Sequence, residues 1–598
     1  MKRRITPLLG LLLSTLLISS VLAERPNAAR IISDQTFAFL RVADTQDFIA
    51  KLEQTSIGKA ANDPQMQPFI NGIWQTLKQW AANAEERSGL TLEEILSIPQ
   101  GELAIGVVAM QEGNPGVLIL CDLGEDTRVV ERVLSLLETV AGNDGALIER
   151  NKHKDAEITL IRGNNGPLAV CIHENTLLLS NRIEAVEDSL DNWSGEREDS
   201  LASDDRFSTI VSASRGTKDE PAQMIWYVNP IDGLRTVTRD QPGGGYVMGF
   251  LPVLGLDGIK AIGGSNIFAT EDFDSIGHLH IMLERPRTGV IEMIALKNAS
   301  TDPEVWVPED VTNYMTSNWD VEKCYGALEN LYDSIFGEGK LAEDIDRRIN
   351  QRTGIDFKTE VLDNLEGKFT LVQWYEPPAR INSQATFIAA KVKDRAAMQR
   401  TIDRIVESLP RLNDIVEKKN FGDATYYSAN VGNAPIPEDV PEDRRRRMEN
   451  RRTLRPEPCF GLIGDFLFFA DRPGIVEHIA MTHGGDIPRL ADDLSFKLVL
   501  NQLQEQAGER KLAMVSFARP EESLRMIYEL VQADSTRNFI SQRAERNDFF
   551  NNLQGNLEAN PLPDFNVISK YLAPSGSIMV DDETGLHWVG FTLKRDSE

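Results

Sequence analysis

The sequence predicts an α+β fold made by tandem duplication, with an antiparallel or mixed sheet in each copy and helices covering one face of that sheet. A unit of strand, short turn and helix occurs twice, at residues 116–142 (GVLILCDLGEDTRVVERVLSLLETVAG) and 384–409 (QATFIAAKVKDRAAMQRTIDRIVESL). The segments on either side of this unit recur in the same order in both halves. Each half then closes on a hairpin with period-2 alternation, which is typical of strands with one buried face.

The elements before the repeated unit form matched pairs. Residues 36–52 predict a strand and a helix capped near Asp44 or Thr45, because these side chains can accept the free amides of a first helical turn. Residues 313–331 predict the same strand and helix in the second half. An amphipathic helix is expected at residues 68–87.

The helix of the repeated unit has the same apolar spacing in both copies. Asp126 and Asp394 occupy the same place and are expected to cap this helix. Apolar residues recur at i, i+4, i+7 and i+11, which puts them on one helix face that must cover a sheet. They are Val130, Leu134, Leu137 and Ala141 in the first copy and Met398, Ile402, Ile405 and Leu409 in the second.

The later elements pair in the same way. Two strands around a polar turn are expected at residues 147–163 and again at 416–430. A strand, a tight turn, a second strand and a helix follow in each half, and there Asn181 aligns with Asp471. The preserved order of these segments indicates duplication rather than chance similarity.

The number of residues that separates matched positions grows along the chain. It is larger between Arg182 and Arg472 than between Gly101 and Gly367. A preserved order with a growing spacing indicates loop insertions in the second copy. We expect a signal segment at 1–23, a first repeat at 24–300, a second repeat at 301–598 and an arginine-rich insertion at 435–458.

The motifs GELAIGVV, GVLILCDL with its helix, and the hairpin CIHENTLLLSNR resemble a family of exported bacterial proteins known only as a domain of unknown function. The resemblance covers most of the chain after the signal segment and rests on hydrophobic pattern. It implies export and the architecture above, and it transfers no catalytic residue.

The N-terminus has the pattern of a secretory signal peptide. Lys2, Arg3 and Arg4 precede an apolar run at residues 8–22, and cleavage is expected after Ala23. An uncleaved anchor is the alternative, but the run is shorter than the roughly 20 residues that cross a bilayer. We expect an exported chain of the periplasm, the cell envelope or the medium, with no transmembrane span after cleavage.

The formal net charge of −28 makes nucleic acid and anionic lipid unsuitable partners. The expected partner is therefore an envelope protein or a glycan.

Four cysteines occur without a CxxC pair, which argues against zinc ribbons and thioredoxin-like motifs. Cys121 and Cys171 fall in expected strands of the first repeat, where they could form a disulfide in an oxidising compartment. Two buried free thiols are the alternative.

The insertion PIPEDVPEDRRRRMENRRTLRPEP is the most unusual stretch of the chain. Guanidinium groups can hold sulfate, phosphate or carboxylate groups, so an anionic ligand could bind here. A solvated loop that pairs with its own acidic residues is the alternative. The candidate binding residues are Arg444, Arg445, Arg446, Arg447, Arg451 and Arg452.

No cofactor or metal site is expected. His278 and His280 alternate on one expected strand, but two histidines without an identifiable third ligand favour satisfied histidines over a metal. The glycine-rich residues 241–250 lack the lysine and the flanking elements of a phosphate-binding loop, and a flexible loop is expected there.

The sequence contains no GxSxG, HExxH or Cys-His motif, and the two halves share almost no reactive side chains. We therefore expect a non-enzymatic binding or scaffold protein, with enzymatic activity left open. The alternative is a hydrolase of unrecognised type that acts on an envelope substrate in a cleft between the repeats.

Overall fold

The computed structural model gives the positions of residues 25–595 with several gaps. The residues outside the description within this range are 89–90, 126–130, 132–145, 164–165, 196–198, 216–220, 377–382, 414, 430–439, 443, 446–456, 533–535, 537–540, 544–550, 552–553 and 556–557.

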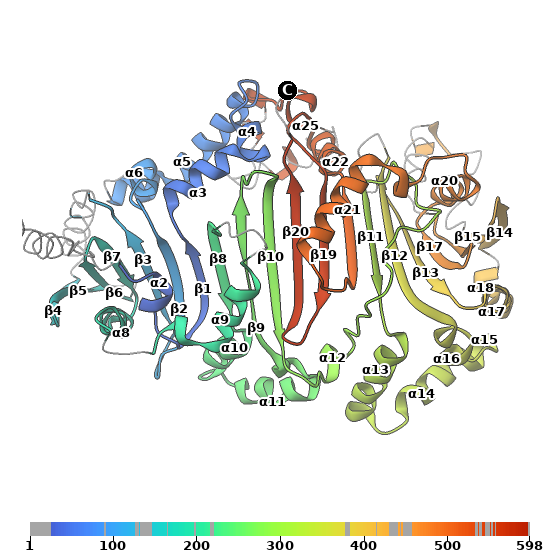
Figure 1. The fold of residues 1–598 in the computed structure, drawn as a ribbon, viewed down its shortest axis with the longest axis horizontal. Coiled ribbons are helices and arrows are strands. Elements are labelled where there is room, and N and C mark those ends of the chain that lie inside the picture. Colours follow the sequence, from blue (N-terminus) through green and yellow to red (C-terminus); the bar gives the residue numbers. More distant parts are fainter. Residues whose placement is uncertain are drawn as a thin grey trace, which may run out of the picture.

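The protein is α+β, and its strands form one continuous antiparallel sheet (Figure 1). The first half contributes β1 (Thr36–Val42), β2 (Leu103–Val108), β3 (Gly116–Asp122), β4 (Leu147–His153), β5 (Ala156–Gly163), β6 (Gly166–His173), β7 (Thr176–Ser180), β8 (Met224–Val228), β9 (Ile259–Phe268) and β10 (Phe273–Leu283). The second half contributes β11 (Asn313–Asn318), β12 (Leu365–Tyr375), β13 (Gln384–Val392), β14 (Val416–Phe421), β15 (Ala424–Ala429), β16 (Cys459–Ile463), β17 (Phe466–Ala470), β18 (Met514–Ala518), β19 (Ser575–Asp581) and β20 (Gly585–Leu593).

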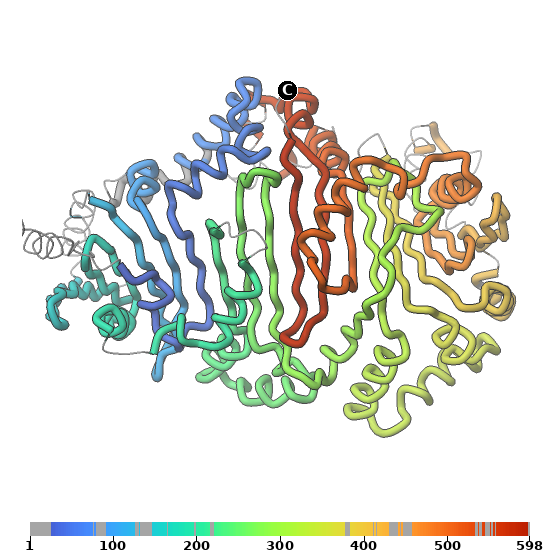
Figure 2. The backbone as a smooth tube through the Cα atoms, in the orientation of Figure 1, coloured from blue at the N-terminus to red at the C-terminus, as the bar shows by residue number. Residues whose placement is uncertain are grey.

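The strand order of the first half recurs in the second. In the first half the order is β4-β5-β6-β7-β3-β2-β1-β8-β9-β10. In the second half it is β14-β15-β16-β17-β13-β12-β11-β18-β19-β20. Figure 2 shows the two halves side by side, with the last strands of the chain in the middle of the molecule.

Side chains aligned in the sequence make the same contacts in both halves. The Asn181 carboxamide oxygen accepts a hydrogen bond from the amide of Val117 at 2.6 Å, which ties the end of β7 to β3. The Asp471 carboxylate accepts the corresponding bond from the amide of Thr386 at 3.1 Å, between β17 and β13. The alignment of Asn181 with Asp471 is therefore matched by their contacts.

The two halves join where β10 pairs with β20 along nearly the whole length of both strands. His278 lies opposite Val589 near the middle of this ladder. Ile276 with Phe591, and His280 with His587, are the pairs two residues to either side. We call this ladder the seam.

The described helices of the first half are α2 (Ala28–Ile31), α3 (Thr45–Gln54), α4 (Ser56–Ala61), α5 (Gln67–Ser88), α6 (Leu92–Leu96), α8 (Ile183–Trp193), α9 (Asp205–Ala213), α10 (Pro230–Thr238), α11 (Gly244–Leu254) and α12 (Gly289–Glu292). Those of the second half include α13 (Val321–Phe336), α14 (Lys340–Ile345), α15 (Gln351–Thr353), α16 (Phe357–Glu360), α17 (Arg395–Ser408), α18 (Pro410–Asn413), α20 (Pro473–Gly484), α21 (Leu494–Ala507), α22 (Pro520–Gln532) and α25 (Asn566–Ser569). The expected strand and helix of residues 36–52, the helix of 68–87 and the Asp44 cap are confirmed, because Asp44 accepts from the amides of Gln46 and Asp47.

Helices α8, α9, α20 and α21 pack on one face of the sheet, which we call the helix face. Figure 1 looks onto this face, where α21 lies over β19. Several side chains that point toward these helices from the central strands are 0–4 % exposed. They include Tyr227, His278, Ile578, Val589 and Val515.

The expectation that helices cover only one face is wrong at the outer end of the second half. Met398 and Ile402 of α17 pack with Tyr427 and Leu462 on the face opposite to α20. The neighbouring residue Tyr426 packs on the α20 side, so strands here are buried on both faces. Asp394 caps α17 as expected, by accepting from the amide of Ala397 at 2.9 Å. Asp126, Val130, Leu134, Leu137 and Ala141 lie outside the described residues.

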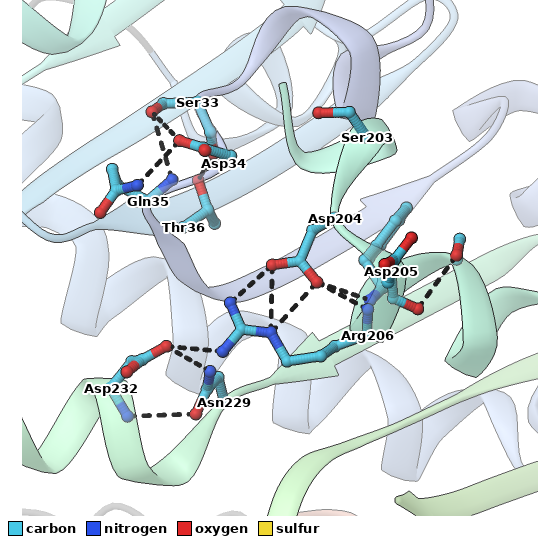
Figure 3. A network of polar contacts seen from close by, with 12 residues as sticks. Ser33, Asp34, Gln35, Thr36, Ser203, Asp204, Asp205, Arg206, Asn229 and Asp232 are labelled. Carbon is cyan, nitrogen blue, oxygen red and sulfur yellow. Dashed lines mark hydrogen bonds and ion pairs between the residues drawn. The ribbon is translucent and has the colours of Figure 1, made fainter. Parts of the chain in front are cut away.

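An arginine holds α9 and α10 together above the strands (Figure 3). The Arg206 guanidinium contacts both carboxylate oxygens of Asp204 at 2.6–3.1 Å and the Asp232 carboxylate at 2.8 Å. Burial disfavours the charge of Asp204, but the hydrogen bonds from Arg206 outweigh it and keep the pKa of Asp204 below its ordinary value. Asp204 also begins α9 by accepting from backbone amides of its first turn.

The segment 241–250 is not the flexible loop expected from its glycines. Gly243 has a left-handed backbone (φ 88°), and α11 begins at the next residue. Helix α11 packs against α10, α12 and α13, and these tertiary contacts outweigh the low helix propensity of glycine.

Candidate ligand-binding face

The second face of the central strands keeps its large side chains partly exposed, and we call it the open face. One row of cross-strand neighbours runs over it from β1 to β18, at right angles to the strands. Its members are mostly large and apolar, with a single glycine. In order they are Leu40, Trp226, Gly264, Leu279, Trp588, Met579 and Met514.

Two rows of small polar residues lie beside the apolar row at the seam. The nearer row consists of Asn266, Gly277, Gly590, Ser577 and Ser516. The farther row contains Ser275, Thr592 and Ser575. Large side chains therefore border small ones, which leaves a depression of about 390 Å³ across five strands.

The indole of Trp588 forms one wall of this depression. A Cβ added at Gly590 would lie 2.4 Å from the six-membered ring of Trp588, and one added at Gly277 would lie 3.6 Å from it. The ring therefore occupies the space above these two glycines, and a side chain at Gly590 would displace it.

The depression is uncharged. None of the residues that line it is acidic or basic. Three larger cavities of about 650–790 Å³, elsewhere in the described chain, are each lined by several charged residues. In a chain with a net charge of −28, the uncharged lining distinguishes this depression from those three cavities.

Three buried histidines lie on the helix face of the same strands. His278, His280 and His587 are 0–4 % exposed, and Nδ1 of His278 lies 3.4 Å from Nε2 of His587. His280 Nε2 lies 3.2 Å from the hydroxyl of Thr584. The other ring nitrogen of each histidine has no hydrogen-bond partner in the described part of the chain.

Burial keeps these histidines neutral. Desolvation, aided by the Arg510 charge, lowers the pKa of His278 to about 4. Desolvation, with smaller effects of His278 and Arg510, lowers the pKa of His587 to about 3. The pKa of His280 is also lowered by burial, against an opposing effect of Asp582. Across the described residues, no set of three or more His, Cys, Asp or Glu side chains is placed to hold a metal ion.

The junction of the two halves is a paired ladder, not a deep cleft. The depression at this junction is lined by no carboxylate and no histidine among its described residues. The groups that a hydrolase acting between the repeats would use are therefore not gathered there.

The structure places little of the arginine-rich insertion. Arg444 is exposed and Arg445 is half-buried, and both backbone amides donate to the carbonyl of Pro441. The other candidate residues of this loop lie outside the described residues: Arg446, Arg447, Arg451 and Arg452.

Cys121 and Cys171 are both buried free thiols, which is the second of the two alternatives drawn from the sequence. Cys121 pairs with Leu177 of β7, and Cys171 pairs with Leu178 of the same strand. Adjacent residues of a strand point to opposite faces, so the two sulfur atoms lie on opposite sides of the sheet with β7 between them. Burial raises the pKa of each thiol to about 11.

Sequence reasoning did not identify Trp588 or the rows beside it. The strand GLHWVGFTL does contain a glycine two residues after Trp588, which is a local signal for a ring lying along a strand. The serines and Asn266 come from other strands, and only the register of the sheet brings them together.

No family model, no curated protein and no solved structure matches this chain. In the described part of the chain, every helix is too short or too polar to traverse a bilayer.

Proposed function

We propose that this chain is an exported, non-enzymatic binding or scaffold protein of the cell envelope, and that the open face of its sheet is the binding surface. The exposed apolar side chains of the open face are the observation that supports this proposal. This face carries exposed apolar pairs near both of its ends, although these residues belong to well-formed strands: Leu40 (38 % exposed) lies opposite Ile105 (36 %) on β1 and β2, and Ile388 (48 %) lies opposite Phe469 (58 %) on β13 and β17. Exposed apolar side chains gathered on one surface are typical of sites that contact a partner.

Export is proposed from the signal-like N-terminus, the basic residues and apolar run of residues 1–23. We also propose that the protein arose by tandem duplication of a ten-strand α+β unit. The repeated strand order and the matched contacts of Asn181 and Asp471 support this origin.

A pull-down from a detergent-solubilised envelope fraction tests the binding role. The mature protein, residues 24–598, is immobilised, and the retained protein and glycan are identified by mass spectrometry. We expect retention to fall at least about tenfold in the double variant Leu40→Glu, Ile388→Glu, because two charges on an apolar contact surface oppose desolvation. Both sites are partly exposed, so the fold should tolerate the change.

Two control variants locate the surface. Phe250→Glu alters a 61 % exposed side chain on α11, outside the sheet, and should leave retention unchanged. Arg444→Ala with Arg445→Ala tests the insertion as the binding site. A specific component lost only in the arginine variant would move the site to the insertion, and no specific retention would remove the binding role.

A further inference from the structure

The depression at the seam has an aromatic wall and a polar border side by side. Trp588 belongs to the apolar row, and its ring lies over Gly277 and Gly590. Hydroxyl and amide groups of Ser275, Asn266 and Thr592 border the same hollow. A ligand seated here would meet an apolar ring on one side and hydrogen-bonding groups on the other.

Several of these polar groups have hydrogen-bonding capacity left over. Within the described chain, no partner is found for the side chains of Asn266, Ser275, Ser575 and Thr592 or for the indole N–H of Trp588. Ser516 and Ser577 bond to each other at 2.6 Å, which uses one of their two hydroxyl protons. The second proton still needs an acceptor, either on Ser577, which is 7 % exposed, or on the partly buried Ser516, depending on which hydroxyl donates within the pair.

The aromatic wall, the polar side chains and the uncharged lining together indicate which class of ligand would fit. A charged ligand would find no counter-charge in the lining, and an acyl chain would cover the hydroxyl and amide groups without pairing them. A pyranose ring has an apolar C–H face and equatorial hydroxyl groups, which suit the indole and the polar rows. A volume of about 390 Å³ lies at the small end of the roughly 300–1,000 Å³ range of ligand sites.

We propose that this depression binds an uncharged sugar unit of an envelope glycan, with the ring against Trp588 and the hydroxyl groups on the serine, threonine and asparagine side chains. This inference rests on the proposed binding role of the open face and specifies its ligand. The glycan chain would follow the apolar row, where Trp226 lies three strands from Trp588, roughly 14 Å away.

The test is a glycan array probed with the mature protein. The array carries neutral oligosaccharides of hexose and N-acetylhexosamine, together with matched uronate-containing and sulfated oligosaccharides. We expect retention on neutral oligosaccharides. The Trp588→Ala variant should weaken that binding at least about tenfold, as loss of a central aromatic contact does at other binding sites. Ser516→Ala should weaken it by about threefold to tenfold, because one hydroxyl partner is lost.

Ser516→Ala removes a single oxygen atom and should fold. It therefore still tests the inference if Trp588→Ala fails to fold. The matched control is Phe250→Ala on α11, which should bind like the wild type. Preference for anionic oligosaccharides, absence of neutral glycan binding, or binding that neither Trp588→Ala nor Ser516→Ala weakens would each overturn the inference. If neutral glycans fail while pull-down still depends on Leu40 and Ile388, the binding role stands and only the sugar assignment falls.

Discussion

At the scale of single residues, the seam combines exposed and buried groups on neighbouring positions. Trp588 faces the open side, and the next residue toward the N-terminus, His587, is buried on the helix side. Three neutral histidines in one place are unusual in a core, because each offers polar nitrogen atoms that need partners. Protonation of these buried histidines favours the unfolded chain, so the joint between the two halves should be sensitive to acid.

Stability should therefore fall as the pH falls. In the unfolded chain the histidine pKa values return to about 6.5, whereas in the folded chain they are depressed, to about 4 for His278 and about 3 for His587. The unfolded state then binds more protons below pH 6.5. The histidine contribution is complete above that pH and is lost on acidification, by up to about 1.4 kcal/mol per pH unit for each histidine.

Urea unfolding between pH 7.5 and pH 5 measures this dependence. The double variant His280→Phe, His587→Ile should show a clearly shallower loss of stability in this range. Ile276 opposite Phe591 shows that the same ladder accommodates such an apolar pair. Equal slopes for the variant and the wild type would refute the role of the histidines.

At the scale of elements, both halves secure the segment before their first strand with a buried ion pair, but with the charges exchanged. In the first half Glu102 accepts from the amide of Ala28 at 3.1 Å and pairs with Arg41. At the matched position Lys368 lies 2.9 Å from Glu304 and also donates to the carbonyl of Asp302. The matched positions have the same structural role but carry opposite charges. The shared role therefore cannot be recognised from the residue types in the sequence.

The change Lys368→Met should destabilise the protein by about 3 kcal/mol, because it leaves the carboxylate of Glu304 buried without its cation. Adding Glu304→Gln should recover most of this loss. Chemical denaturation of the two variants measures both effects. Lys391→Met is the control, since it removes only the partly exposed ion pair with Glu366 and should cost less than about 1 kcal/mol. A loss at Lys368 no larger than at Lys391 would show that Glu304 is not buried as described.

Element identity could be read from the sequence where the local pattern is strong. The strand and helix of residues 36–52, the cap at Asp394 and the closing hairpins follow from alternation, spacing and capping chemistry. Burial on both faces of β15 and β16 was missed, although the nearly unbroken apolar run CFGLI of β16 is its signal. Helix α11 was missed because tertiary contacts decide the state of a glycine-rich segment.

At the scale of the whole molecule, one sheet runs through both halves and presents two different faces. This continuity could not be predicted, because the pairing of β10 with β20 joins residues about 300 positions apart and leaves no local pattern. The same long-range pairing forms the depression, so the candidate site could not be predicted from the sequence either.

The two edge strands of the sheet are easier to recognise from the sequence. The edge strands β4 and β14 carry Lys152, Lys418 and Lys419, which discourage pairing with another sheet.

Hydroxyl-radical footprinting of the mature protein, with and without the envelope fraction, tests the role of the open face most directly. Tryptophan and methionine side chains oxidise readily, and this face carries Trp226, Trp588, Met579 and Met514 in one row. We predict that the envelope fraction protects these four side chains and leaves Tyr246 on α11 unprotected. Unchanged oxidation of the row, or protection confined to Tyr246, would contradict the account.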